Sequence, residues 1–355
     1  MAKAGYDVYV IAPRKERLPR ETNGVQFVLV PENRNYLGRL RNLFRIYKAA
    51  RNLHPQVCHC HEPDSLLVGA VLKWRHGIKL VFDSHELWSG VVEQRLPRWV
   101  ARAAARLYGR FEAALLRRCD AAIGAASAIT GKLSASVGPD RAATLLNVPA
   151  VEVFEEPKTK PPEGVFVLCH DGALTFDRGL KVMAEAVRQL SGAHKVVFRI
   201  VGDVFNAERE WLEAYVKEFH LENVIQRTGW LPYEKVGAAL AECHLGLVAF
   251  TRKPNHVIAA PNKIFNYLLC GLPFIGPDFM VEMQRMAADD GCCLLADCAS
   301  PQSLAQAVES LLLDRPRFDR MAQSAKEASL RKYRWQYMET RLLALYRQVL
   351  AGDGQ

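Results

Sequence analysis

Residues 261–276 read PNKIFNYLLCGLPFIG, and the interpretation of the whole chain starts from this stretch. Pro261 precedes a short apolar segment, and Gly271 and Pro273 follow it. Proline fits the start of a helix because its missing N–H needs no partner there, and glycine is the usual residue after the last turn. The stretch therefore predicts a loop, a short helix and then a buried strand over 272–276.

The amino end of this short helix suits an anion. The first N–H groups of a helix have no intrahelical partner, and the helix dipole adds positive potential there. Asn262 begins the expected helix, and Lys263 in its first turn should add a full positive charge. The same residues also fit an ordinary buried helix of an α/β sheet, and the stretch alone does not separate the two interpretations.

Length and composition indicate a globular protein. The chain has 355 residues, which suits two domains of ordinary size. It contains no apolar run of the ~18–20 residues that a membrane-spanning helix needs. Its nine cysteines are an odd number without a disulfide-framework spacing, which indicates reduced thiols. We therefore expect a cytoplasmic protein.

The positive charge is concentrated in the first part of the chain. Residues 1–150 hold 23 Lys and Arg against 12 Asp and Glu, whereas the remainder holds 24 against 26. A one-sided basic surface indicates a polyanionic partner, either a nucleic acid or an anionic membrane. No nucleic-acid-reading motif is present, so we expect no nucleic acid and favour a membrane surface.

A predicted helix over 97–118 carries much of this charge. One side is apolar and the flanks are basic: Trp99, Ala103, Leu107, Phe111, Leu115 and Leu116 against Arg98, Arg102, Arg106, Arg110, Arg117 and Arg118. The apolar side could pack on a sheet and leave a solvated basic face. Alternatively the helix lies on anionic phospholipid, which would place the protein peripherally on the inner face of the cell membrane.

Residues 57–61, VCHCH, predict a strand in which side chains alternate between faces. Cys58 and Cys60 should then face one way, and His59 and His61 the other. A zinc site needs its ligands together or partners from elsewhere. No second Cys/His pair of suitable spacing follows, so we expect no metal.

Several phrases follow one another in a recognisable order. They are His-x-His-Glu-Pro at 59–63, Asp-x-His-Glu at 83–86, a Gly-rich loop at 171–179, Gly-x-Leu-Pro at 229–232 and Pro-x-Lys-x-Phe-x-Tyr at 261–267. In this order the chain resembles the family 4 glycosyltransferases, which have the GT-B fold.

The resemblance implies two Rossmann-like α/β domains with parallel sheets, facing each other across a cleft. The first strand of the N-terminal domain would be missing, because the chain begins where the family has its second strand. The expected parts are an acceptor-side domain over 1–150, a Pro-, Lys- and Glu-rich linker over 151–164, a nucleotide-sugar-binding domain over 165–334, and a terminal helix over 335–355 that crosses back to the first domain.

The implied activity is retaining transfer of a sugar from a nucleoside diphosphate sugar to an acceptor hydroxyl, as in a hexosyltransferase of polysaccharide biosynthesis. The basic first half favours a lipid-linked or envelope glycan as the acceptor. No cofactor is expected, since the nucleotide sugar is a substrate. No carboxylate stands in a clear nucleophile position, which favours front-face displacement assisted by the leaving phosphate.

The family pattern also implies roles for single residues. His85 would hold the donor sugar, with Glu86 orienting it or contacting the acceptor. Arg178 and Lys263 would stabilise the diphosphate, and Asn266 would contact the ribose. The remaining substrate-binding candidates lie in loops at the carboxyl ends of strands or at the helix start: Gly172, Gly179, Gly202, Asp203 and Asn262.

The chain departs from the family pattern at three positions, where Asn266 and Ile258 replace glutamates and Ala173 replaces an arginine. These departures, with the missing start, support an alternative: a catalytically silent or truncated sugar-nucleotide-binding protein. A third hypothesis, a nicotinamide-dependent enzyme, lacks the G-x-G-x-x-G phrase that it needs.

Overall fold

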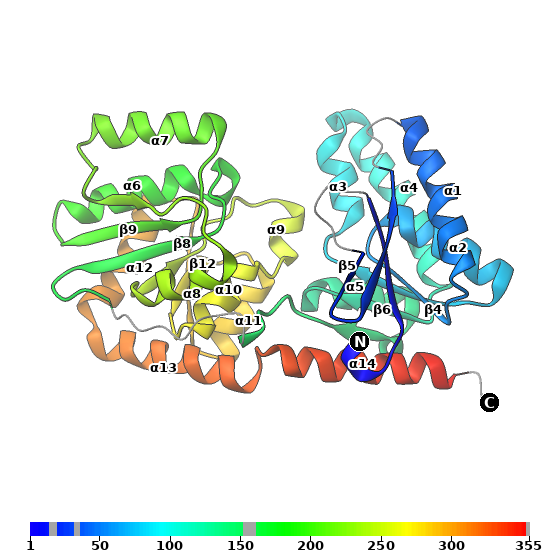
Figure 1. Ribbon diagram of the computed structural model, residues 1–355. Coiled ribbons are helices and arrows are strands. Elements are labelled where there is room, and N and C mark those ends of the chain that lie inside the picture. The colour runs from blue at the N-terminus through cyan, green and yellow to red at the C-terminus, as the bar shows by residue number, and fades with distance from the viewer. Residues whose placement is uncertain (14–19, 32–35, 152–160, 353–355) are drawn as a thin grey trace. The chain divides into compact units, whose positions relative to one another are not determined.

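The computed structural model describes residues 1–13, 20–31, 36–151 and 161–352. The chain forms two compact units (Figure 1), of which unit 1 is Met1–Leu145 with Glu339–Gln355 and unit 2 is Leu146–Met338. Most of the expected linker over 151–164 lies outside the described residues. The predicted α/β class with parallel sheets in two domains is confirmed.

Unit 2 contains a six-stranded parallel sheet in the order β10-β9-β8-β11-β12-β13. Its strands are β8 Phe166–Asp171, β9 Val196–Val201, β10 Ile225–Arg227, β11 Leu245–Leu247, β12 Phe274–Pro277 and β13 Cys293–Ala296. The order reverses between β8 and β11, since β9 and β10 extend the sheet on one side and β11 to β13 on the other. This is the strand order of a dinucleotide-binding fold.

Helices follow each strand of unit 2. They are α6 Leu180–Ser191, α7 Asn206–Glu218, α8 Tyr233–Ala241, α9 Pro254–Ile258, α10 Asn262–Leu269, α11 Val281–Asp289, α12 Pro301–Leu313 and α13 Arg315–Arg331. Fully buried side chains of α6 and α12, such as Met183 and Val308, form one core with β8, β9 and β11. The predicted short helix and the strand after it are confirmed as α10 and β12. The segment before α10 contains the short helix α9.

The strands of unit 1 form two sheets. One has the order β1-β3-β2 and the other is parallel in the order β4-β5-β6-β7. The strands are β1 Val8–Pro13, β2 Glu21–Thr22, β3 Val25–Val30, β4 Val57–Cys60, β5 Lys79–Ser84, β6 Ala121–Gly124 and β7 Ala142–Thr144. Among the described residues, no strand pairing joins the β1-β3-β2 sheet to the β4-β5-β6-β7 sheet. In β1 the side chains of Tyr9 and Val10 are exposed.

Helices cover both faces of the β4-β5-β6-β7 sheet. The helices of unit 1 are α1 Tyr36–Asn52, α2 Pro63–His76, α3 Trp88–Arg95, α4 Arg98–Leu116, α5 Ser127–Val137 and α14 Trp335–Ala351. Cys58 of β4 and Ile11 of β1 pack against the α1–α2 layer. Val81 of β5 packs with Leu345 and Val349 of α14. Since α14 includes residues 339–351, the end of the chain belongs to unit 1 (Figure 1).

The prediction for residues 97–118 needs correction. The segment forms α4, but Trp99, Leu107 and Phe111 are exposed, at 85%, 71% and 49%. The residues that α4 buries are Ala101, Ala105, Leu115 and Leu116. The small alanines let this face approach its neighbours closely, so the large side chains are left on the opposite, arginine-rich face. No described helix is long and apolar enough to cross a membrane.

Candidate functional site

In unit 2 the carboxyl end of β8 lies at the point where the strand order reverses. Ligands of open α/β sheets bind outside the carboxyl ends of the strands at such a point. β8 ends in His170 and Asp171, which are buried polar residues in a strand that is otherwise apolar. The candidate site of unit 2 is built around these two side chains.

Glycines bring the surrounding loops together. Gly172 has φ of 86°, and its N–H donates to Val201 O at the end of β9. A Cβ at Gly202 would lie 2.5 Å from Gly172 O, and one at Gly179 would lie 2.2 Å from Ala249 O. Only glycine permits these approaches, so the loop after β8 packs directly on the chain that follows β9 and β11. The three glycines predicted from the sequence therefore shape one surface.

Lys263 lies beneath this surface. It is only 7% exposed, and its Nζ lies 2.8 Å from His170 Nε2 and 2.5 Å from Asp171 O. Burial, which is the main cause, and the nearby positive charge of Arg178 lower the pKa of Lys263 to about 7, although Asp171 acts in the opposite direction. Burial, which is the main cause, and the positive charges of Lys263 and Arg178 also lower the pKa of His170.

Burial therefore makes the charged form of Lys263 less favourable than it would be in water. An incoming anion would favour the charged form and raise this pKa again. Lys263 can therefore take up a proton when a negative group binds.

Asn266 is buried one turn beyond Lys263. Its Nδ2 donates to Asp171 Oδ2 at 2.6 Å, and its Oδ1 accepts from Tyr233 Oη at 3.1 Å. Burial raises the pKa of Asp171, while the Asn266 hydrogen bond and Lys263 lower it. The side chain expected to contact the ribose is thus already hydrogen-bonded at both ends, next to a carboxylate.

The remaining predicted residues of unit 2 lie around the same strand ends. Arg178 is half-buried, and its Nη1 donates to Ala173 O at 2.8 Å, so the guanidinium lies over the loop after β8. Asn262 is the exposed first residue of α10. Asp203 accepts from Val204 N at 2.8 Å and from Arg209 Nη2 at 3.0 Å, so its carboxylate shapes the loop after β9.

In unit 1 the predicted residues lie at the carboxyl end of β5. His85 is 44% exposed, and its Nε2 lies 3.7 Å from Asp83 Oδ1. The ring of His85 also stacks on that of His61, at 5.9 Å between centroids. Glu86 is exposed, and its backbone O accepts from Ser84 Oγ at 2.8 Å.

Sequence reasoning missed three residues of the unit 2 site, His170, Asp171 and Tyr233. A signal was present for two of them, because a buried strand that ends in two polar residues at a Gly-rich loop is typical of a ligand site. Tyr233 gave no signal, since it reaches Asn266 only through the fold. The short helix α10 supplies Lys263, Asn266 and Tyr267 to one strand end, and Tyr267 Oη accepts from Asp171 N at 3.0 Å.

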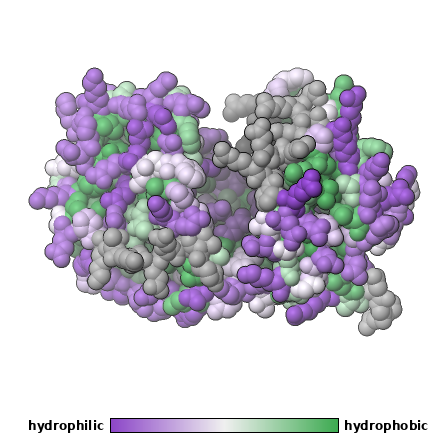
Figure 2. All heavy atoms as spheres, viewed as in Figure 1, coloured by the Kyte–Doolittle hydropathy of each residue, from purple (hydrophilic) through white to green (hydrophobic). Residues whose placement is uncertain are grey.

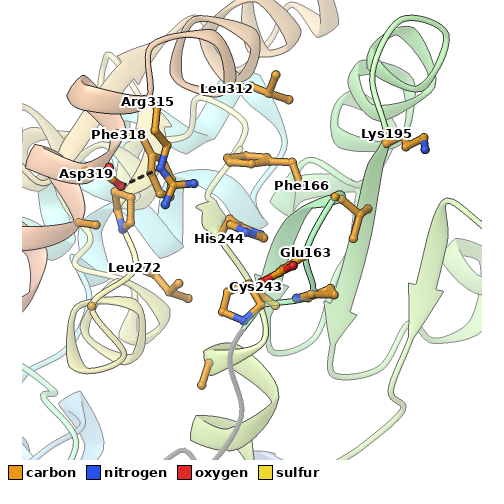
Figure 3. Close-up of a pocket in the computed structure, with 18 of the residues that line it drawn as sticks. Glu163, Phe166, Lys195, Cys243, His244, Leu272, Leu312, Arg315, Phe318 and Asp319 are labelled. Atoms are coloured by element: carbon orange, nitrogen blue, oxygen red, sulfur yellow. Dashed lines mark hydrogen bonds and ion pairs between the residues drawn. The ribbon is translucent and has the colours of Figure 1, made fainter.

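A cavity of about 780 Å³ lies elsewhere in unit 2 (Figure 3). It is lined by Phe166 and Lys195, which lie at or next to the amino ends of β8 and β9, and by Arg315 and Asp319 of α13. Two of its charged groups pair with each other, as Arg315 Nε lies 2.9 Å from Asp319 Oδ1. Since β8 separates it from Asp171 by the length of the strand, this cavity is not the predicted site.

Two family models match the chain. Residues 1–146 match the model described as Glycosyltransferase Family 4, and residues 166–314 match the one described as Glycosyl transferases group 1. Among curated proteins, the glycogen synthase of Mycobacterium tuberculosis is 21% identical over 310 residues, which span 86% of this chain and 72% of that protein.

Solved structures show the same fold. Sucrose-phosphate synthase from Thermosynechococcus elongatus matches with a TM-score of 0.78 at 17% identity, over 99% of this chain and 91% of that one. Anabaena Alr3699/HepE in complex with UDP matches with a TM-score of 0.71 at 16% identity, over 91% of this chain and 86% of that one. These similarities show that the chain has the GT-B fold.

The buried position of Lys263 predicts a pH dependence of stability. Its pKa falls from the ordinary 10.5 to about 7 on folding, so between these pH values the unfolded chain binds more protons than the folded one. The Lys263 contribution therefore makes the folded state more stable as pH rises through this window. Lys263→Met removes that contribution. The thermal midpoint of the wild type should therefore rise relative to that of the variant as the pH increases toward 10. Lys217→Met, at an exposed position of α7, should give a constant difference. Parallel curves for both variants would contradict the assignment.

Proposed function

The chain belongs to glycosyltransferase family 4, and from that premise we propose that it transfers a sugar from a nucleoside diphosphate sugar to an acceptor hydroxyl with retention of configuration. The acceptor is a lipid-linked or envelope glycan. The observation that carries this proposal is the pair of cationic groups, Arg178 and Lys263, at the switch point of the unit 2 sheet.

The switch-point residues suit a diphosphate. Arg178 lies in the loop that opens α6 and can form two parallel hydrogen bonds to phosphate oxygens. Lys263 lies close enough for the charge of Arg178 to lower its pKa. Charge that develops on a leaving diphosphate would be stabilised by both groups and would hold Lys263 in its protonated form.

A nucleoside diphosphate sugar is the donor that this arrangement favours. HepE, which shares the fold, was solved with UDP, so UDP is the first nucleotide to test. The Asp171–Asn266–Tyr233 chain of hydrogen bonds supplies the polar groups beside the diphosphate position. Asp171 rather than residue 266 then carries the carboxylate that the donor ribose would meet.

The sugar would be transferred by front-face displacement, in which the leaving diphosphate takes the proton of the attacking hydroxyl. His85 contacts the donor sugar and braces the reacting carbon. Its neighbour Asp83, at 3.7 Å, favours the ring orientation that presents the other edge of the imidazole to the sugar. Glu86 contacts the acceptor.

The exposed face of unit 1 supports a membrane-bound acceptor. On α4 the exposed residues Trp99, Leu107 and Phe111 alternate with exposed arginines, and on α1 the exposed residues Leu37, Leu40 and Phe44 recur at helical spacing. Figure 2 shows hydrophilic and hydrophobic residues side by side over unit 1. Large apolar side chains flanked by arginines are typical of helices that lie in the interface of an anionic membrane. The protein then works peripherally on the inner face of the cell membrane.

Arg178→Ala should weaken binding of UDP. Hydrogen bonds to charged groups contribute roughly 1.5–3 kcal/mol each, so the affinity should fall about 10- to 150-fold. Isothermal titration with UDP, GDP and NADH measures this. Arg315→Ala, on α13 beside the cavity at the amino ends of β8 and β9, should bind UDP as the wild type does. Tight binding of NADH alone would overturn the proposal in favour of a nicotinamide-dependent enzyme.

His85→Ala should reduce turnover far more than donor binding. Loss of one group that stabilises the reacting centre costs roughly 100-fold in kcat, whereas the donor is held chiefly by unit 2. A donor-hydrolysis assay with UDP-sugars compares the wild type, His85→Ala and His76→Ala, the last an exposed histidine of α2. If the wild type binds UDP but hydrolyses no donor, the silent sugar-nucleotide-binding protein is the correct assignment.

Replacing the exposed arginines of α4 should strongly weaken binding to anionic vesicles. Each basic residue near such a surface contributes about 1 kcal/mol, so Arg102, Arg106 and Arg110 changed together to Gln should weaken partitioning about 100-fold. Liposome flotation with and without anionic lipid is the measurement. A control variant with Arg252, Arg320 and Arg331 of unit 2 changed to Gln has the same net charge and should still float. Equal binding of the wild type to neutral and anionic vesicles would contradict the proposal.

A further inference from the structure

The carboxyl ends of β4 and β5 in unit 1 bring two histidines and an aspartate together. His59 lies on β4 and His61 follows it, while Asp83 lies on the paired strand β5. One donor atom from each of these residues lies within 4.8 Å of the others. Alternation along β4 turns both imidazoles to the face away from Cys58 and Cys60, and the parallel register places Asp83 beside them.

The separations within this cluster fit metal ligands better than hydrogen bonds. His59 Nε2 lies 3.4 Å and His61 Nδ1 lies 3.5 Å from Asp83 Oδ2. Hydrogen bonds between such groups are usually 2.7–3.2 Å long. Two atoms each ~2.0–2.1 Å from a tetrahedral Zn²⁺ are about 3.3–3.4 Å apart, which follows from the tetrahedral angle. Both imidazole nitrogens therefore already lie from the Asp83 oxygen at nearly the distance that one ion would impose, and the two nitrogens lie within 4.8 Å of each other.

A fourth side chain orients the first ligand. Tyr346 of α14 has its Oη 2.7 Å from His59 Nδ1. When Nδ1 is the protonated nitrogen and donates to this hydroxyl, Nε2 presents its lone pair toward Asp83. Metal-binding histidines typically have such a partner on the ring nitrogen that does not bind the metal. The contact joins residues 287 positions apart, so the fold itself fixes the orientation of the ring.

From this geometry we infer that His59, His61 and Asp83 bind a divalent transition-metal ion of the Zn²⁺ class. Two imidazoles and a carboxylate are a donor set that Zn²⁺, Co²⁺ and Ni²⁺ accept. Three protein ligands leave a coordination position for water or another oxygen ligand. The carboxylates of Glu62 and Glu86, which follow the same two strands in sequence, add negative charge at this edge.

The expectation of no metal was based on the lack of a partner for the two histidines. The structure supplies that partner, because Asp83 comes from the neighbouring strand and is only 13% exposed in its side chain. Asp83 also lies 3.7 Å from His85 Nε2, so an ion on Asp83 would change the surroundings of His85. The inference concerns metal binding alone, and it does not depend on the proposed transferase activity.

Zn²⁺ titration by calorimetry, and Co²⁺ as a coloured probe, test the inference on the full chain. The wild type should bind one Zn²⁺ per chain, and Co²⁺ should give visible bands without the near-ultraviolet band of a cobalt–thiolate bond. The absence of that band separates this site from the nine free cysteines. His61→Gln and Asp83→Asn should abolish binding, and His76→Gln should bind as the wild type does.

Tyr346→Phe gives a second, graded readout. It removes only the hydroxyl that orients His59, and loss of such a partner typically weakens metal binding 10- to 100-fold. Circular dichroism should show that all variants are folded; His61 is 58% exposed in its side chain, so its replacement leaves the core intact. A wild type that binds no Zn²⁺, a thiolate band with Co²⁺, or unchanged binding in His61→Gln would each overturn the inference, and none of them bears on nucleotide binding by unit 2.

Discussion

The site of unit 2 depends on a single buried ammonium group. Lys263 Nζ contacts His170 Nε2 and the backbone oxygen of Asp171, so it fastens α10 to the end of β8 across more than ninety residues of sequence. Removing a cation from water costs several kcal/mol unless hydrogen bonds replace the lost hydration. The incomplete replacement explains why the pKa of Lys263 falls to about 7. The short helix therefore holds, at the phosphate position, a group whose charge responds to the ligand.

The position of Lys263 also decides what the next turn of α10 does. Residues three and four positions further along a helix lie on the same face, so Asn266 and Tyr267 reach the same strand end. Asn266 donates to the Asp171 side chain, and Tyr267 accepts from the Asp171 N–H. A glutamate at position 266 would bury a second carboxylate against Asp171, which like-charge repulsion and desolvation both disfavour. Asn266 avoids this repulsion, because its neutral amide donates a hydrogen bond to the Asp171 carboxylate. This contact gives a physical reason for the departure from the family pattern.

Local patterns predicted much of this structure. Proline and glycine marked the ends of α10. Alternation along 57–61 correctly placed the cysteines and the histidines on opposite faces: Cys58 packs toward α1 and α2, and His59 contacts α14. The orientation of α4 could not be predicted in this way. That helix carries one stripe of small residues around Ala101 and Ala105 and another of large ones around Trp99 and Leu107. Helical periodicity of hydrophobic residues points to the stripe of large side chains as the buried one. In the fold the stripe of small side chains is buried, because it allows closer packing.

The features that sequence reasoning missed all join residues from different strands or helices. The Asp171–Asn266 and Tyr233–Asn266 hydrogen bonds and the His59–Asp83 contact depend on sheet register and helix placement, which no local pattern specifies. Both units nevertheless follow one rule, because the polar side chains of buried parallel strands collect where the strands end. The side chains at these strand ends determine which ion each unit attracts. At the carboxyl end of β8 an ammonium and a guanidinium attract an anion. At the carboxyl ends of β4 and β5 imidazoles and a carboxylate offer lone pairs to a cation.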